Sequence, residues 1–163
     1  MKRIASLICQ FLFAVIIALV YSGCASSLQG PAFTPINEIP EGKSLIYLYR
    51  PDDKKRTEFE IKCNENQICI MENKGYYPFF IGEGKVEITS TVKFKMFATG
   101  LLDAGLYGST DFVFKAEPGK IYYLECEADG GSGGQKLNIK IVPENFGSIR
   151  IKDCILLPSV TQQ

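Results

Sequence analysis

The sequence predicts an all-β fold, an antiparallel β-sandwich of about seven to eight strands with room for one short C-terminal helix. Three observations predict it: short segments in which apolar and polar residues alternate, glycine- and proline-rich turns between them, and almost no helical periodicity after residue 43. Strands at this spacing favour two packed sheets over one open sheet. In a chain of 163 residues, a single folded domain over residues 44–157 is the expected organisation.

Eight segments carry the strand signals. In chain order they are Ser44–Tyr49, Glu58–Cys63, Ile68–Met71, Tyr76–Phe80, Val86–Phe97, Phe112–Ala116, Tyr122–Ala128 and Leu137–Ile141. The first is apolar on both faces, as a central buried strand should be, whereas the second turns Phe59, Ile61 and Cys63 inward. Glu117-Pro118-Gly119-Lys120 has the residues of a type II turn. One short helix is expected from Pro143 to about Asp153, with the proline in its first turn.

The N-terminus has the three regions of a secretory signal. Met1–Arg3 is basic, Ile4–Val20 is apolar apart from three residues, and small residues follow. The apolar run contains a glutamine and is shorter than the stretch of about 20 residues that a membrane-spanning helix requires. Residues 1–23 are therefore expected to be a signal peptide.

The end of this segment carries a candidate modification site. Ser22-Gly23-Cys24 resembles the lipobox of bacterial lipoproteins, although Tyr21 stands where that motif usually has an aliphatic residue. The resemblance implies cleavage before Cys24 and attachment of acyl chains such as palmitate to it, and Ala25 implies transit to the outer membrane. The implied location is the outer membrane, facing the periplasm or the cell surface. A secreted protein without lipid is the alternative.

Two segments outside the domain are expected to lack regular structure. Residues 24–43 are rich in proline, glycine and serine and show no strand or helix period, so they are expected to be a flexible tether. Fully extended, such a tether would reach up to about 60 Å from the bilayer. Residues 158–163 are expected to be a C-terminal tail.

Three segments resemble motifs of the bacterial family known as domain of unknown function 2846. They are Leu45–Pro51, Phe80–Ile88 and Ala116–Leu124, and the similarity extends over about Lys43–Val142. The hairpin at Asn64–Gln67 departs from the family's usual Asn-Gly or Asp-Gly. The resemblance implies an envelope β-domain, often lipidated, with no established activity, so it implies no catalytic residue.

Composition removes several classes of function. Histidine is absent, which excludes Ser-His-Asp and Cys-His nucleophile pairs and histidine-ligated metal sites. The 18 basic and 18 acidic side chains give a formal charge of zero, which offers no basis for binding nucleic acid. No cofactor is expected.

Four cysteines in the domain are candidates for disulfides: Cys63, Cys69, Cys126 and Cys154. Their wide spacing lacks the paired knuckles of a zinc site, and an exported chain favours disulfides. A three-residue loop at 65–67 would place Cys63 opposite Cys69, leaving Cys126 to pair with Cys154. Four cysteines allow three connectivities, so this pairing remains one of three.

Carboxylate pairs are the enzymatic alternative. They are Asp52-Asp53, Glu58/Glu60 and Glu125/Glu127. A glycosidase needs two facing carboxyl groups across a cleft, but residues two apart on a strand share a face, so a solvated surface is the expected role of both Glu pairs. Arg50 either binds an anionic ligand or closes a strand end.

Aromatic and apolar side chains are the candidates for binding. Tyr76, Tyr77 and the two phenylalanines after them suggest a sugar-stacking platform, although alternation should turn every second ring into the core. The segment 98–109 carries Leu102, Leu106 and Tyr107 among glycines. These residues either plug the sandwich or dock on an envelope protein or a second copy of the chain.

The sequence therefore predicts a lipid-anchored envelope protein that acts by binding or structural contact and not as an enzyme. A carboxylate-based periplasmic hydrolase or a carbohydrate-binding module is the alternative.

Overall fold

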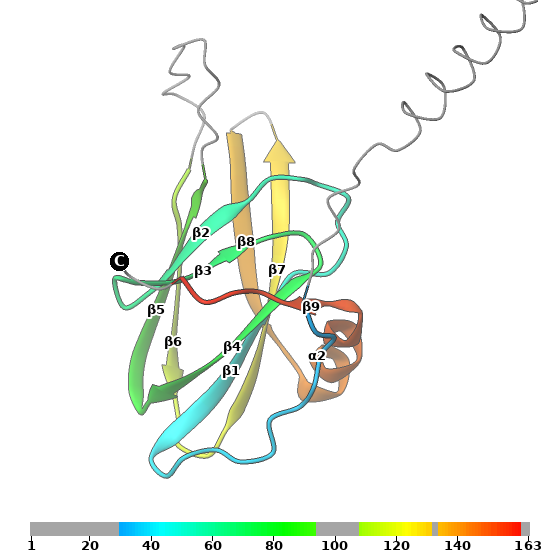
Figure 1. Cartoon of the computed structure of the whole chain (residues 1–163). Coiled ribbons are helices and arrows are strands. Elements are labelled where there is room, and N and C mark those ends of the chain that lie inside the picture. Colours follow the sequence, from blue (N-terminus) through cyan, green and yellow to red (C-terminus); the bar gives the residue numbers. More distant parts are fainter. Residues whose placement is uncertain (1–29, 94–107, 132–133, 161–163) are drawn as a thin grey trace, which may run out of the picture.

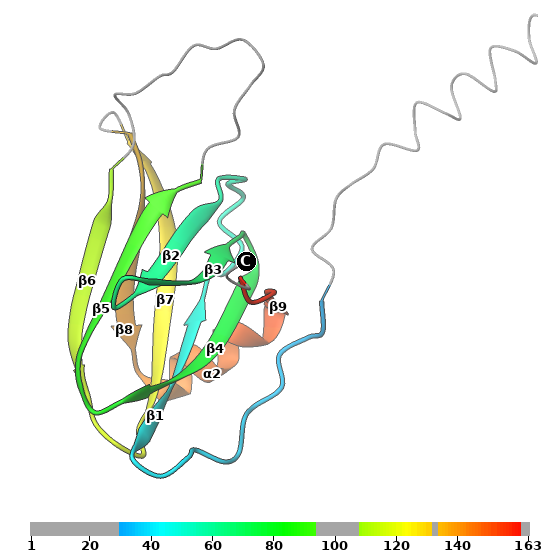
Figure 2. The ribbon, with the colours of Figure 1, turned by 60° about the vertical axis from the view of Figure 1, so that its left-hand side comes forward.

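Two β-sheets packed face to face form the domain (Figures 1 and 2). The computed structural model describes residues 30–93, 108–131 and 134–160. Within these residues, a five-stranded sheet and a four-stranded sheet, with one short α-helix outside them, confirm the predicted all-β sandwich.

The strands agree with the expected segments to within a few residues at their ends. Their bounds are β1 Lys43–Tyr49, β2 Phe59–Cys63, β3 Asn66–Met71, β4 Gly75–Gly82, β5 Gly84–Val92, β6 Thr110–Ala116, β7 Ile121–Gly131, β8 Gly134–Val142 and β9 Ile155–Leu156. The helix α2 covers Glu144–Arg150 and continues as a 3₁₀ turn, η1, over Ile151–Asp153, as predicted. The two-residue strand β9 was not predicted, because so short a segment shows no alternation.

The two sheets differ in strand direction. The four-stranded sheet has the order β3-β2-β5-β6 and is antiparallel throughout. The five-stranded sheet has the order β8-β7-β1-β4-β9, and in it β1 runs parallel to β7 and antiparallel to β4. The predicted antiparallel pairing therefore fails in this sheet at β1/β7 and at β4/β9, which are parallel, and holds for β1/β4 and β7/β8. A parallel pair needs a long crossover connection. Here the chain between β1 and β7 contains all four strands of the four-stranded sheet and also β4.

The main core fills the space between the sheets. Ile46 and Leu48 of β1 face Phe59 and Ile61 of β2, and all four side chains are excluded from solvent. The alternation predicted for β2 is confirmed, because Phe59, Ile61 and Cys63 are buried and the two residues between them are only partly buried. Burying this apolar surface is the main favourable term in the stability of the sandwich.

A second apolar cluster covers the outer face of the five-stranded sheet. It is built on Leu45, Tyr47, Tyr49, Tyr76, Tyr123, Ile151 and Cys154, with Phe33, Ile36, Ile39, Ile121, Val142 and Leu156 packed against them. The strand β1 is thus buried on both faces, as its sequence predicted.

The N-terminal segment 30–42 contributes to this second cluster. Phe33 packs edge-on against the rings of Tyr47 and Tyr76, with 5.3 Å between ring centroids in each pair. The backbone N–H of Ile36 donates to the Tyr47 hydroxyl at 2.7 Å, and Ala32 forms a β-bridge with Ile155. Residues 30–42 were expected to belong to a flexible tether, but their apolar side chains at 33, 36 and 39 hold them on the sheet.

The helix α2 covers the other part of this outer face. Gly147 is its buried residue, and a Cβ at this position would overlap the ring of Tyr123. The helix can therefore approach the sheet closely only because residue 147 is glycine. Its opposite face is exposed.

Candidate functional site

A buried arginine organises the loop after β1. Arg50 has no exposed surface, and its guanidinium lies 5.4 Å from the centre of the Phe59 ring. Its Nε and Nη2 donate to the two carboxylate oxygens of Asp53, each at 2.9 Å, while Nη1 and Nη2 also donate to the carbonyls of Thr57 and Lys55. Such a bidentate pair is the geometry that guanidinium groups favour with carboxylates. Arg50 is committed to the protein's own loop, so it closes the strand end and does not present a free anion site.

Asp53 joins that loop to the rest of the five-stranded sheet. Its carboxylate also accepts hydrogen bonds from the backbone N–H groups of Lys55 at 3.0 Å and Ala128 at 3.1 Å. Burial acts to raise the pKa of Asp53, but the hydrogen bonds from Arg50, Lys55 and Ala128 outweigh it and hold the pKa below its ordinary value. Asp53 is therefore an ionised structural partner of Arg50 at neutral pH.

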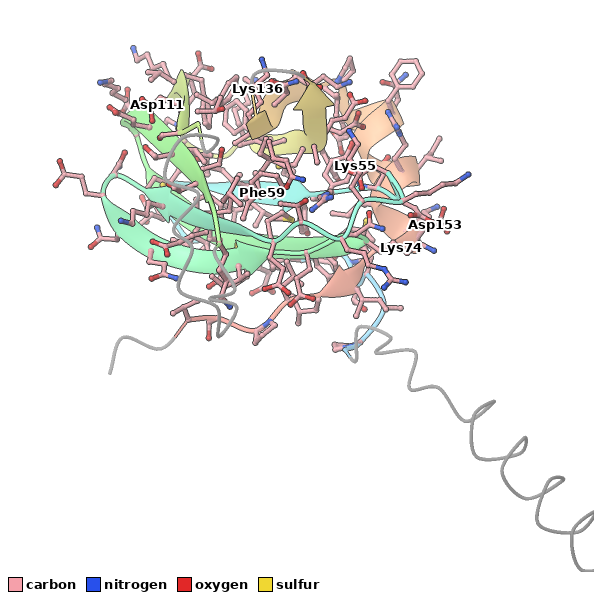
Figure 3. All side chains as sticks on the ribbon, turned by 90° about the horizontal axis from the view of Figure 1, so that it is seen from above. Lys55, Phe59, Lys74, Asp111, Lys136 and Asp153 are labelled. Carbon is pink, nitrogen blue, oxygen red and sulfur yellow. The ribbon has the colours of Figure 1, made fainter. Side chains whose placement is uncertain are left out.

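Asp52 points away from this pair and makes separate contacts. Its carboxylate accepts from the Asn73 amide at 2.9 Å and pairs with Lys74 at 3.0 Å, which lowers its pKa to about 2. Lys74 lies beside β9, because its carbonyl accepts a hydrogen bond of 2.8 Å from the backbone N–H of Ile155. Figure 3 shows Lys74 on the same side of the molecule as Asp153. The adjacent carboxylates of Asp52 and Asp53 thus bind different partners.

A second polar cluster lies under α2, around Glu125 of β7. Only 2% of Glu125 is exposed. Its carboxylate accepts a hydrogen bond from the Tyr49 hydroxyl at 2.9 Å and forms ion pairs with Arg150 at 2.7 Å and Lys140 at 3.0 Å. Burial, followed by the hydrogen bond and charge of Glu125, raises the pKa of Tyr49, so this phenol remains a donor.

This arrangement corrects the expectation that Glu125 and Glu127 form one solvated face. Glu127 is exposed as expected, but Glu125 lies where α2 and its Arg150 cover the sheet. The sequence signal that was available is a glutamate placed between two apolar residues, Leu124 and Cys126. Its cation is supplied by a helix about 25 residues further along the chain, which alternation cannot reveal.

The remaining carboxylate pair lies on the outer face of the four-stranded sheet. Glu58 forms an ion pair with Lys93 at 3.6 Å, and Glu60 forms one with Lys62 at 3.4 Å. Each carboxylate thus has a lysine beside it on the sheet surface. These contacts fit the expected surface role of this pair.

The aromatic residues proposed as a platform are split between the two faces of β4. Tyr76 is 3% exposed and lies beneath Phe33 in the outer cluster, whereas Tyr77 and Phe79 point into the main core. Phe80 alone of these four is exposed, at 40%. Alternation along the strand separates the rings as predicted, so they do not form one sugar-stacking surface.

The four cysteines of the domain are free and buried in the structure, so the two predicted disulfides are absent. The hairpin between β2 and β3 has a two-residue turn, Asn64-Glu65, with φ angles of 46° and 70°, as a type I′ turn requires. This turn and a bulge place Cys63 opposite Asn66 and Cys69 opposite Ile61. Cys63 and Cys69 are then diagonal neighbours, about 7–8 Å apart, beyond the reach of a disulfide without backbone movement.

The other predicted pair is separated by the five-stranded sheet itself. Cys126 belongs to the main core, whereas Cys154 belongs to the cluster on the outer face. Desolvation by burial raises the pKa of the Cys154 thiol to about 12, and the pKa of Cys126 rises with burial and with the nearby Cys69 thiol. A reactive thiol requires the opposite shift, so these cysteines serve as core residues.

Several predicted site residues lie outside the described part of the chain. They are Cys24, Leu102, Leu106 and Tyr107. Across residues 30–93, 108–131 and 134–160, no group of three or more histidine, cysteine or acidic side chains could hold a metal ion. Among the same residues there is no helix with the length and hydropathy that crossing a membrane requires.

Comparison with known proteins finds one family. A family model with the description "Protein of unknown function (DUF2846)" matches residues 40–136. No curated protein matches the chain, and no solved structure does. The matched region runs from just before β1 into β8, so α2 and β9 follow it and the segment 30–39 precedes it.

Proposed function

This chain belongs to the family of proteins of unknown function DUF2846, and on that premise we propose that it is a lipid-anchored bacterial envelope protein. In this proposal the protein is attached through Cys24 to the outer membrane, and its β-sandwich acts through binding or structural contact without catalysing a reaction. The observation that carries the proposal is the Ser22-Gly23-Cys24 sequence directly after the apolar run Ile4–Val20.

The position of the cysteine supports an anchor over a stray thiol. Cys24 comes at the point where a signal peptide would be cleaved, and it is followed by Ala25 and two serines. Two or more acyl chains on one residue give stable membrane attachment, whereas a single chain gives only marginal binding. Lipidation at this residue would therefore fix the domain to one membrane surface.

The two buried polar clusters support a binding or structural role. Arg50 and Glu125 are buried and Asp53 is partly buried, and each is engaged by neighbours within the chain. A catalytic acid or base must reach a substrate proton. These three side chains instead connect the loop after β1, the strand β7 and the helix α2.

Replacement of the cysteine tests the anchor. Cells producing the full chain are given a labelled fatty acid, and membrane and soluble fractions are compared for the natural sequence, Cys24→Ala and Cys9→Ala. Cys9 is the matched control because it is a cysteine within the apolar run. We expect label and membrane attachment in the natural chain and in Cys9→Ala, and neither in a processed Cys24→Ala protein. Equal labelling of Cys24→Ala would overturn the proposal.

A further inference from the structure

We propose that the α2 side of the domain rests on the lipid surface to which Cys24 is attached, with Phe146 and Ile149 at the contact. This inference rests on the proposed lipid anchor and adds an orientation to it. Three features of the molecule lead to it: the short chain between the anchor and the fold, the place where that chain joins the fold, and the exposed apolar side chains found there.

The distance from the anchor to the fold is short. The whole segment 24–43 was expected to be a flexible tether between the membrane anchor and the folded domain. In the structure, the chain is already held on the sheet from Gly30 onward. The backbone N–H of Leu156 donates to the carbonyl of Pro31 at 3.0 Å, and Ala32 bridges to Ile155. If the mature chain begins at Cys24, residues 24–29 precede Gly30, so six Cα-to-Cα steps, or at most about 22 Å, separate Gly30 from the anchor.

The chain joins the fold beside α2. A Cβ at Gly30 would overlap the carbonyl of Leu156 and the side chain of Ile155, so Gly30 touches β9. The strand β9 follows α2 and η1 almost directly, with a single residue between η1 and β9. Figures 1 and 2 show the first described residues on the side of the sandwich where α2 and β9 lie, with β6 on the opposite side. A short anchor therefore brings this side, and not the four-stranded sheet, toward the bilayer.

The exposed face of α2 is apolar. Phe146 is 60% exposed and Ile149 is 64% exposed, the two largest values among the exposed large hydrophobic side chains of the described residues. Residues three apart lie on the same face of a helix, and Gly147 holds the opposite face on Tyr123. The two side chains therefore project together, away from the sheet.

The charges around these two residues do not oppose contact with a membrane. Arg150 and Lys140 both pair with Glu125. Lys152 is exposed beside α2, and Glu144 and Asp153 are the exposed acids of this segment. The surface is thus close to neutral, and the apolar side chains would supply the attraction.

The anchor explains why a small patch is enough. One aromatic and one aliphatic side chain bury too little surface to hold a free protein on a bilayer. A short tether, however, raises the effective concentration of these two side chains at the bilayer surface to the order of millimolar, as other short linkers do. The length of the preceding chain and the point where it ends therefore favour the lipid surface over a second copy or another protein.

The absence of tryptophan from the chain allows a direct test. Phe146→Trp places the single tryptophan of the chain at the proposed contact, and Ile149→Trp is a second, independent reporter there. Val113→Trp is the matched control, because Val113 is 50% exposed on β6 of the opposite sheet. The full mature proteins are purified from membranes and reconstituted in vesicles of phosphatidylethanolamine and phosphatidylglycerol, with and without brominated acyl chains.

We expect the emission of Phe146→Trp and Ile149→Trp to shift to shorter wavelength on reconstitution and to be quenched by brominated lipid, with neither effect for Val113→Trp. Vesicle-bound protein whose tryptophans at 146 and 149 keep solvent-exposed emission would overturn the orientation and leave the anchor standing. A wavelength shift without quenching would also overturn it and indicate a protein contact. Failure of all three proteins to float with the vesicles would contradict the anchor itself.

Discussion

The hydroxyl of Tyr49 donates a hydrogen bond of 2.9 Å to the carboxylate of Glu125, across the parallel pair β1 and β7 on the outer face of the five-stranded sheet. Both residues are almost completely buried, and Arg150 reaches the same carboxylate from α2. This contact joins the centre of the sheet to the helix that covers it.

Replacement of Glu125 should weaken the fold. Glu125→Gln removes the charge that Arg150 and Lys140 face and leaves one oxygen fewer for the phenol of Tyr49. We expect a loss of about 1–3 kcal/mol in the free energy of unfolding, measured by urea denaturation. Glu127→Gln is the control, because Glu127 is exposed on the same strand, and it should change the free energy by less than about 0.5 kcal/mol. Equal effects of the two changes would contradict the burial of Glu125.

Arg50 should be intolerant of even a conservative change. Arg50→Lys keeps the charge but cannot reproduce the paired hydrogen bonds to Asp53 while also reaching the carbonyls of Thr57 and Lys55. We expect a loss on the order of 3 kcal/mol in the free energy of unfolding, because several hydrogen bonds of a buried charge are lost. Arg56→Lys, at an exposed position of the same loop, should have little effect. A stable Arg50→Lys protein would show that the loop does not depend on this side chain.

The contribution of Asp53 should depend on pH in one direction. Its pKa is lower in the folded protein than in the unfolded chain, so its contribution to stability is fully present above the ordinary carboxyl pKa of about 4. That contribution is lost as the pH falls through the folded-state pKa. We therefore expect the difference in the free energy of unfolding between the natural protein and Asp53→Asn, measured by urea denaturation, to become smaller as the pH is lowered from about 4. A difference that stays constant down to the lowest pH at which the protein folds would contradict an ionised Asp53.

The thiols of the domain should be free and unreactive in the folded protein. Cys63, Cys69, Cys126 and Cys154 are at most 5% exposed, and burial raises the pKa of each. We expect no alkylation of these four by iodoacetamide near neutral pH in the native state and alkylation of all four in denaturant without reductant. Peptide mapping that finds any disulfide among them in the exported protein would contradict the structure at these positions.

Local strand signals, which are alternation, apolar runs and the turns between them, predicted the eight longer strands. Phe59, Ile61 and Cys63 point inward as expected, because successive side chains of a strand point to opposite faces of its sheet. The type II turn is also confirmed, with Gly119 at φ 73° and the N–H of Lys120 bonded to the carbonyl of Glu117. These features depend on local sequence, so local reasoning reaches them.

The outer face of the five-stranded sheet could not be predicted in the same way. Its cover comes from both ends of the described chain, where Phe33 and Ile151 pack in the outer cluster with residues distant in sequence. Isolated apolar residues among prolines predict a flexible tether as long as their packing partners are unknown. Glu125 was predicted to be a surface residue for the same reason, because Arg150 and α2, which cover it, come from a different part of the chain.

The mass of the N-terminal peptide of the mature protein tests the proposed anchor most directly. Protein purified from bacterial membranes is digested, and the N-terminal peptide is identified by mass spectrometry. The peptide should begin at Cys24 and carry the added mass of acyl chains on that residue, with Met1 to Gly23 removed. A mature N-terminus at any other residue, or an unmodified Cys24, would contradict the lipid anchor and with it the orientation proposed for α2.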